Sequence, residues 1–309
     1  DILWTSPITF VASANCALYC GATVDFVDVD IDTALMSVEK LAEKLEYAEK
    51  EGKLPKIVIP VHFSGQPCDM EEIYVLSQKY NFKIIEDAAH AIGAKYKGDT
   101  VGNCRYSDIT VFSFHPVKII TTGEGGAAMT NSPSLADKME LLREHGITRD
   151  LDKMHNTPDG PWYYEQIDLG FNYRITDIQA ALGNSQMNRL DQYVSRRSEI
   201  SEWYDKQFIN TKINPLLRKL NRVSSCHLYV VMVQDGAPSR NSLYNDMHKC
   251  GIGVNLHYIP VYHQPVFNKG TWLENTEIYY DRAISLPIYP TLNNEQLERV
   301  VDKVKCFFK

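Results

Sequence analysis

Short apolar runs alternate with amphipathic segments over the first 190 residues. Runs typical of strands occupy residues 24–29, 57–63, 82–90 and 109–114. Between and after them, apolar residues recur at helical spacing over 36–52, 69–80, 134–146 and 176–190. Strands separated by helices predict an α/β fold, in which a mostly parallel sheet carries helices on both faces.

Polar residues at the starts of these segments predict where three of the helices begin. Ser37 is a plausible N-cap for the helix over 36–52. Asp69, followed three residues later by Glu72, has the pattern of a capping box. We also expect Ser134 to cap the helix that ends near Gly146.

The pattern changes near residue 190. A long polar helix is expected over 191–208, followed by the apolar run 226–233. Further helices are expected near 239–250 and over 294–308. We therefore expect a large domain over 1–190 and a smaller C-terminal α+β domain over 191–309.

Three polar side chains fall at or next to the ends of predicted strands. They are Asp87, His62 and Ser113. Because ligand groups gather beyond the carboxyl ends of parallel strands, we expect these residues to share one site.

Lys118 has apolar neighbours in the sequence, namely Val117, Ile119 and Ile120. A glycine cluster follows. The Lys118 side chain either extends the ammonium group into water or takes part in catalysis. A primary amine is needed for a Schiff base, and apolar neighbours lower a lysine pKa toward the range of a general base. Taken singly, Lys118 also fits a surface residue, Asp87 a turn or cap, and His90 a structural histidine.

Composition restricts the class of protein. The 309 residues carry a net charge of −7, which disfavours a broad nucleic-acid surface, and no apolar run is long enough to span a membrane. The chain starts with no signal peptide. The seven cysteines include no C-x-x-C pair, so we expect reduced thiols, neither a disulfide framework nor a zinc or other metal site, and a cytoplasmic location.

Seven stretches in order resemble the DegT/DnrJ/EryC1/StrS aminotransferases. They are PITFVASANCALYCGA (7–22), VIPVHFSGQPCDM (58–70), EDAAHAIGA (86–94), FSFHPVK (112–118), GEGGA (123–127), LGFNYRITDIQAALG (169–183) and HYIPVYHQP (257–265). That family uses pyridoxal 5′-phosphate (PLP) and acts on nucleotide-linked keto-sugars. The resemblance covers nearly the whole chain and implies the type I fold of PLP-dependent aminotransferases. It also implies a preceding segment with a hydroxyl-rich helix start that holds the cofactor phosphate, so we expect that the N-terminal part of the large domain is missing here.

The resemblance implies a role for each motif residue in cofactor binding. Lys118 corresponds to the lysine that joins PLP and moves protons, and Asp87 to the carboxylate that faces the ring nitrogen. His90 corresponds to a histidine near the ring, Phe10 to the aromatic residue that stacks on it, and Ser113 to a phosphate ligand.

Four further residues are candidates with open alternatives. Asn172 resembles an asparagine contributed by the neighbouring subunit, which implies a homodimer with the site at its interface. Arg174 is a candidate contact for a sugar or nucleotide phosphate, but both residues also suit capping of the helix near Thr176. His257 and Tyr258 correspond to a stretch near the sugar site, or are core or interface aromatics.

The implied reaction is a transamination in two halves. An amino acid, glutamate by resemblance, converts PLP to pyridoxamine phosphate, and the amine then passes to C4 of a UDP-linked 4-keto-6-deoxy sugar, as in pseudaminic acid biosynthesis. The runs 113–126 and 159–174 favour that substrate. Another nucleotide-linked keto-sugar and a non-catalytic binding protein remain alternatives. Family members that remove a sugar hydroxyl carry histidine in place of the lysine, so Lys118 favours amino transfer.

Overall fold

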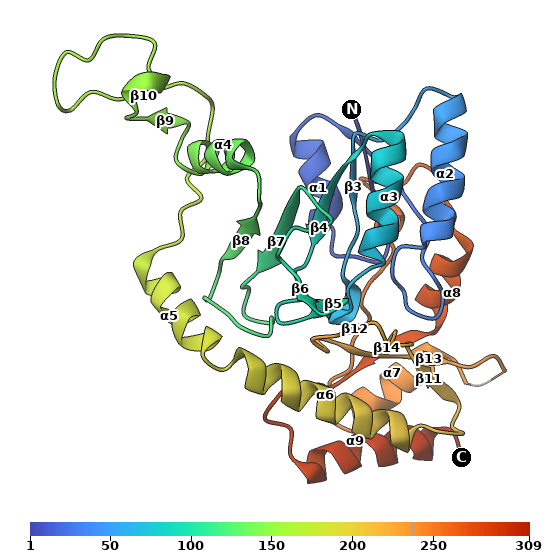
Figure 1. Cartoon of the computed structure of the whole chain (residues 1–309). Helices are drawn as coiled ribbons and strands as arrows, with labels where there is room; N and C mark the ends of the chain where they lie inside the picture. The colour runs from blue at the N-terminus through green and yellow to red at the C-terminus, as the bar shows by residue number, and fades with distance from the viewer. Residues whose placement is uncertain (237) are drawn as a thin grey trace.

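The structure, a computed structural model, describes residues 1–236 and 238–309 (Figure 1). Its main feature is a six-stranded sheet with the order β2-β1-β3-β4-β7-β8. Five strands run parallel and only β8, at one edge, is antiparallel, which confirms the prediction of a mostly parallel sheet. In spatial order the strands are β2 (Thr23–Phe26), β1 (Ile2–Thr5), β3 (Ile57–Ile59), β4 (Lys83–Asp87), β7 (Ile109–Ser113) and β8 (Gly126–Met129).

Helices cover both faces of this sheet because its strands alternate apolar side chains between the two sides. On one face, Trp4 and Val58 lie in a core with residues of α2 (Val38–Lys50) and α3 (Met70–Tyr80). On the other face, Leu3 and Ile59 pack in a separate core with residues of α1 (Ala12–Tyr19).

The observed helix starts confirm one of the three predicted N-caps. Ser37 caps α2 by accepting a hydrogen bond from the Lys40 amide, as predicted. The prediction of a capping box at Asp69 is wrong. Its carboxylate accepts hydrogen bonds from Lys219 and Arg222 and does not cap α3. The cap of α4 (Pro133–Arg143) is Ser132 and not Ser134, since Pro133 occupies the first helical turn.

The C-terminal part of the chain forms a second core around a three-stranded antiparallel sheet with the order β11-β13-β14. The elements of this part of the chain are α6 (Leu190–Gln207), β11 (Ile213–Pro215), β13 (Tyr229–Val233), α7 (Arg240–Lys249), α8 (Glu274–Arg282), β14 (Ala283–Leu286) and α9 (Asn294–Phe307). Of these, α8 contributes Tyr279 to the core of the large sheet. Val230 and Met232 of β13 also point into the core of the large sheet. The division into domains at residue 190 stays a prediction.

Two further contacts join the early and late parts of the chain. A small sheet has the order β12-β5-β6 and is made of β12 (Arg222–Val223), β5 (Lys95–Tyr96) and β6 (Asp99–Thr100). At the start of α8, the buried carboxylate of Asp28 accepts hydrogen bonds from the Asn275 and Thr276 amides, each 3.0 Å long. A carboxylate is favourable there because it meets the unpaired amides of the first helical turn.

One segment projects from the rest of the molecule as an arm (Figure 1). It comprises α4, β9 (Ile147–Thr148), β10 (Glu165–Gln166) and α5 (Asp177–Met187), and none of the residues of α4 or α5 is buried. Within the described residues, no helix has both the length and the apolar character needed to cross a bilayer. All seven cysteines are free thiols.

Candidate active site

The ends of β4 and β7 bring two of the predicted site residues to the same end of the sheet. Asp87 is the last residue of β4 and Ser113 is the last residue of β7, and the two strands are paired in parallel. Gly126, opposite Ser113 in β8, allows close approach there because a Cβ atom would lie 2.7 Å from the Phe112 carbonyl oxygen. The sheet therefore places a carboxylate and a hydroxyl at the ends of two paired strands, and their shared role in one site stays a prediction.

Two donors fix the carboxylate of Asp87. The Ser13 hydroxyl donates to Oδ2 at 2.5 Å, and the Ala89 amide donates to Oδ1 at 3.0 Å. Thr9 Oγ1 lies 2.8 Å from Ser13 Oγ and extends this chain of hydroxyls. Sequence reasoning missed Ser13; the signal available was a hydroxyl residue three positions after Phe10, at the start of a small-residue helix.

His62 does not belong to this site, although it follows β3 as expected. Its buried Nδ1 accepts a hydrogen bond from the Cys68 amide, so Nε2 carries the proton and donates to Glu86 at 2.6 Å. The prediction failed because strand side chains alternate: Asp87 points toward the site, and Glu86 points to the other side of the sheet, where His62 meets it.

Lys118 lies partly buried in a turn that follows β7. Burial lowers the pKa of its amine below the ordinary value, and the Asp87 carboxylate opposes this effect only in part. No hydrogen bond or ion pair with another described residue engages its Nζ atom. An amine without a partner and with a lowered pKa is suited to act as a nucleophile or a proton carrier.

Aromatic residues from three regions gather beside the carboxylate. His90 Nε2 lies 3.1 Å from the Tyr258 hydroxyl, and the two rings are stacked with their centroids 6.1 Å apart. The Phe10 ring lies 6.4 Å from that of Tyr258 and is 62% exposed, so one side of it is open. Phe10, His90 and Tyr258 were all predicted from the sequence, and the structure brings them together.

Three histidines that surround Lys118 are held in the neutral state. Burial, followed by nearby positive groups, keeps the pKa values of His90 and His227 well below the ordinary value. Burial and the Lys118 ammonium lower the pKa of His257 to about 4. His227 was missed from the sequence, where the only signal was a histidine that precedes the apolar run of β13.

The remaining two candidates lie on the arm and are exposed. The arm places Asn172 between Phe171 and Tyr173, whose rings stack with centroids 4.8 Å apart. Neither Asn172 nor Arg174 caps the following helix, because Thr176 does so in a capping box with Gln179. The alternative that the two residues serve as caps is therefore wrong, and their role in binding stays a prediction.

The described residues thus form a site with a reactive amine, a fixed carboxylate and uncharged rings. The carboxylate is suited to hold a proton on a heteroaromatic nitrogen, and the partly exposed Phe10 to cover a flat ring. Neutral histidines and Tyr258 offer hydrogen bonds without adding positive charge beside the amine.

Comparisons with known proteins identify the family of this chain. The model of the DegT/DnrJ/EryC1/StrS aminotransferase family matches residues 1–305. The UDP-4-amino-4,6-dideoxy-N-acetyl-beta-L-altrosamine transaminase of Campylobacter jejuni is 36% identical over 97% of this chain and 77% of its own length. The spore coat polysaccharide biosynthesis protein SpsC of Bacillus subtilis is 35% identical over 100% of this chain and 79% of its own.

Solved structures of sugar aminotransferases have the same fold. Helicobacter pylori PseC, an aminotransferase involved in the biosynthesis of pseudoaminic acid, superposes with a TM-score of 0.89 at 29% identity and covers 100% of this chain and 80% of its own. The putative sugar aminotransferase Spr1654 from Streptococcus pneumoniae, in its PMP form, gives a TM-score of 0.86 at 30% identity over 99% and 81% of the two chains.

Proposed function

Because the chain belongs to the DegT/DnrJ/EryC1/StrS aminotransferase family, we propose that it transfers an amino group from an amino acid to a nucleotide-linked keto-sugar. The protein is a PLP-dependent aminotransferase with the type I fold. The observation that carries the proposal is the environment of Lys118, an amine with a lowered pKa near the Asp87 carboxylate.

The donor set in the site fits PLP. Lys118 would hold the cofactor covalently, and Asp87, fixed by Ser13 and Ala89, would face its ring nitrogen. Phe10 would stack on the ring and Ser113 would bind the phosphate. When bound, the cofactor supplies an aldehyde carbon for the amino group and a ring that stabilises negative charge on the reacting carbon.

The protein's own residues would then control protons. When it is not joined to the cofactor, the Lys118 amine would be free to take a proton from the substrate carbon and to return it. Burial lowers the pKa of this amine, which favours the neutral form that accepts a proton. Asp87 would hold a proton on the ring nitrogen, and the neutral His90 avoids a competing positive charge beside Lys118.

For the substrate, we propose C4 of a UDP-linked 4-keto-6-deoxy sugar, with glutamate as the amino donor, as in pseudaminic acid biosynthesis. The name of the Campylobacter relative and the pathway of the Helicobacter structure support this choice. Arg174 is proposed for a phosphate of the nucleotide, and His257 and Tyr258 for the sugar. Another nucleotide-linked keto-sugar is the alternative.

We further propose a homodimer in which Asn172 of the partner subunit completes the cofactor site. The arm supports this because it exposes large apolar side chains that a second copy would cover, including Trp162 at 69%, Leu169 at 82% and Ile178 at 84%. A cytoplasmic location is proposed from the seven free cysteines.

The test uses purified protein with added PLP. We expect a visible absorbance band from cofactor joined to Lys118, which Lys118→Ala abolishes and which glutamate converts to the spectrum of the aminated cofactor. Product analysis by mass spectrometry with UDP-4-keto-6-deoxy sugars then identifies the acceptor. A band of equal strength in Lys118→Ala contradicts the proposal.

A further inference from the structure

We propose that His227 is a positioning residue for His90, an inference that rests on the proposed PLP-dependent function. The two imidazole rings lie with their centroids 4.4 Å apart at an interplanar angle of 38°, and both are buried. His227 comes from the segment before β13, more than a hundred residues after His90 in the chain.

His90 needs such a neighbour because its own hydrogen bonds do not fix the ring. Nε2 has one partner, the Tyr258 hydroxyl at 3.1 Å. Nδ1 is buried and has no hydrogen-bond partner among the described residues. A ring held at one atom is free to tilt about that bond, so packing must set its orientation. The Phe63 and Tyr258 centroids are each 6.1 Å away, and the His227 ring is nearer than either.

The backbone of His227 is held firmly enough to serve this purpose. Its amide donates to the Ser64 carbonyl at 2.9 Å, and its carbonyl accepts from the buried guanidinium of Arg197 at 3.2 Å. Two residues earlier, the Ser225 hydroxyl donates to the His90 carbonyl at 2.7 Å. One segment therefore fixes both the backbone of His90 and the ring that packs on its side chain.

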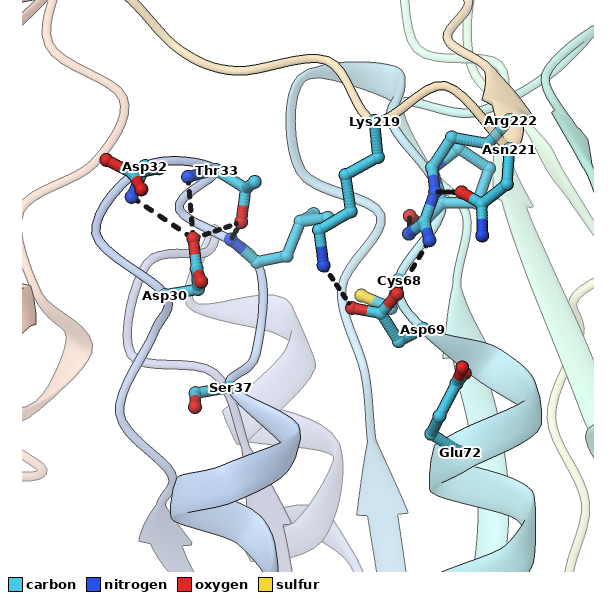
Figure 2. A network of polar contacts seen from close by, with 12 residues as sticks. Asp30, Asp32, Thr33, Ser37, Cys68, Asp69, Glu72, Lys219, Asn221 and Arg222 are labelled. Carbon is cyan, nitrogen blue, oxygen red and sulfur yellow. Dashed lines mark hydrogen bonds and ion pairs between the residues drawn. The ribbon is translucent and has the colours of Figure 1, made fainter.

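A polar network anchors the start of the same segment (Figure 2). Asp69, at the start of α3, accepts from Lys219 Nζ at 2.7 Å and from Arg222 Nη2 at 2.6 Å. The Arg222 side chain is only 1% exposed, and its Nη1 also donates to the Pro67 carbonyl at 2.7 Å. Residues 219–228 are thus tied to residues 64–69 at both ends, and His227 keeps its place without a hydrogen bond from its own Nδ1.

The chemistry of the pair also suits the site. Both rings are neutral because burial lowers their pKa values, and Lys118 acts on both in the same direction. The contact therefore orients His90 without adding a positive charge beside the amine that the proposed reaction needs.

Two substitutions of His227 separate ring packing from general stability. We expect His227→Ala to weaken PLP binding about fivefold and to shift the absorbance spectrum of the bound cofactor, because His90 loses its orientation. His227→Phe, which keeps a flat ring in the same place, should restore most of the affinity and the spectrum. In a His90→Ala background, His227→Ala should produce no further change in either quantity, because it acts through His90.

Tyr229→Phe is the matched control, since Tyr229 is buried directly after the same segment, at the start of β13, but donates to Asp205 and not to the site. It should lower the melting temperature and leave PLP affinity and spectrum unchanged. Additive effects of His227→Ala and His90→Ala, or a His227→Ala protein with a lower melting temperature and unchanged cofactor properties, would overturn the inference. Loss of the Lys118-dependent band in the wild type would instead overturn the proposed function.

Discussion

Lys118 has apolar neighbours in the sequence, yet the groups that determine its chemistry come from other parts of the chain. Asp87 comes from the end of β4, and the neutral histidines around the amine include His227 and His257 of the C-terminal part. Burial lowers the pKa of the amine and of all these imidazoles for the same reason, since removal from water disfavours every positive charge.

The low pKa of His257 makes the stability of the protein depend on pH. In the unfolded chain a histidine takes up a proton below about pH 6.5, whereas in the fold His257 resists protonation until about pH 4. Stability should therefore fall as the pH drops through this range, because the unfolded state binds the extra proton. His257→Gln should reduce that slope by up to about 1.4 kcal/mol per pH unit.

The measurement is urea unfolding at several pH values between 4 and 7. Glutamine is a suitable replacement because it can keep a hydrogen bond to Ser285 Oγ, which lies 2.8 Å from His257 Nδ1. His90 and His227 still contribute to the slope of the variant, so a reduced but nonzero slope is expected. Identical slopes for the two proteins would contradict the prediction.

At the scale of elements, the start of α3 is joined to the strand β12 through Asp69. Burial by itself would raise the pKa of this carboxyl group, but the hydrogen bonds from Lys219 and Arg222 outweigh it and the pKa is lowered. The local sequence pattern predicted that the same carboxylate would cap α3. An ion pair across the fold has replaced a cap within the helix.

Asp69→Asn should therefore destabilise the protein more than the loss of a helix cap would. The buried Arg222 would lose its charged partner, which costs about 3 kcal/mol of unfolding free energy. The difference from wild type should be largest near pH 7. It should shrink below about pH 4, where the carboxyl group takes up a proton in the unfolded wild-type chain before it does so in the fold, because the fold lowers its pKa.

Denaturant unfolding at pH 7 and pH 3.5 measures both effects. Glu43→Gln is a suitable control, because it removes an exposed ion pair with Lys40 on α2 and should change stability little. A loss in Asp69→Asn no greater than that of the control would show that the network contributes nothing to stability.

At the scale of the whole molecule, the arm is the part that a single copy leaves without a packing partner. If Asn172 serves the site of the other subunit, two inactive variants should repair each other. Mixing Lys118→Ala with Asn172→Ala subunits, unfolded and refolded together, should restore about a quarter of wild-type activity, since only mixed dimers contain one intact site.

Ile178→Glu tests the surface itself, because a charge on the arm should prevent association. It should convert the dimer to a monomer in analytical ultracentrifugation and abolish the repair. Val75→Glu alters a side chain of α3 that is 61% exposed, and it should leave the dimer intact. Repair that persists with Ile178→Glu in both chains would argue against the shared site.

The sequence predicted best where local pattern and tertiary environment agree. The alternation of strand-like and helical patterns correctly predicted a mostly parallel sheet. It also placed Asp87 and Ser113 at the ends of strands, where the structure has them. Prediction failed at Asp69, which binds distant residues, and at His62, whose partner lies on the opposite face of the sheet. It failed at Ser134 for a local reason, because Pro133 occupies the first turn of α4. Ser13 and His227 were missed because only the fold brings a helix start and the segment before β13 to the ends of β4 and β7.

The hydrogen bonds from the start of α8 to Asp28 have a consequence for synthesis of the protein. Asp28 leaves the ribosome nearly 250 residues before its partners Asn275 and Thr276. Tyr279 and Ala283, which fill the core of the first sheet, come later still. The core of the first sheet must therefore stay unfinished, and open to chaperones, until residues 275–283 are translated.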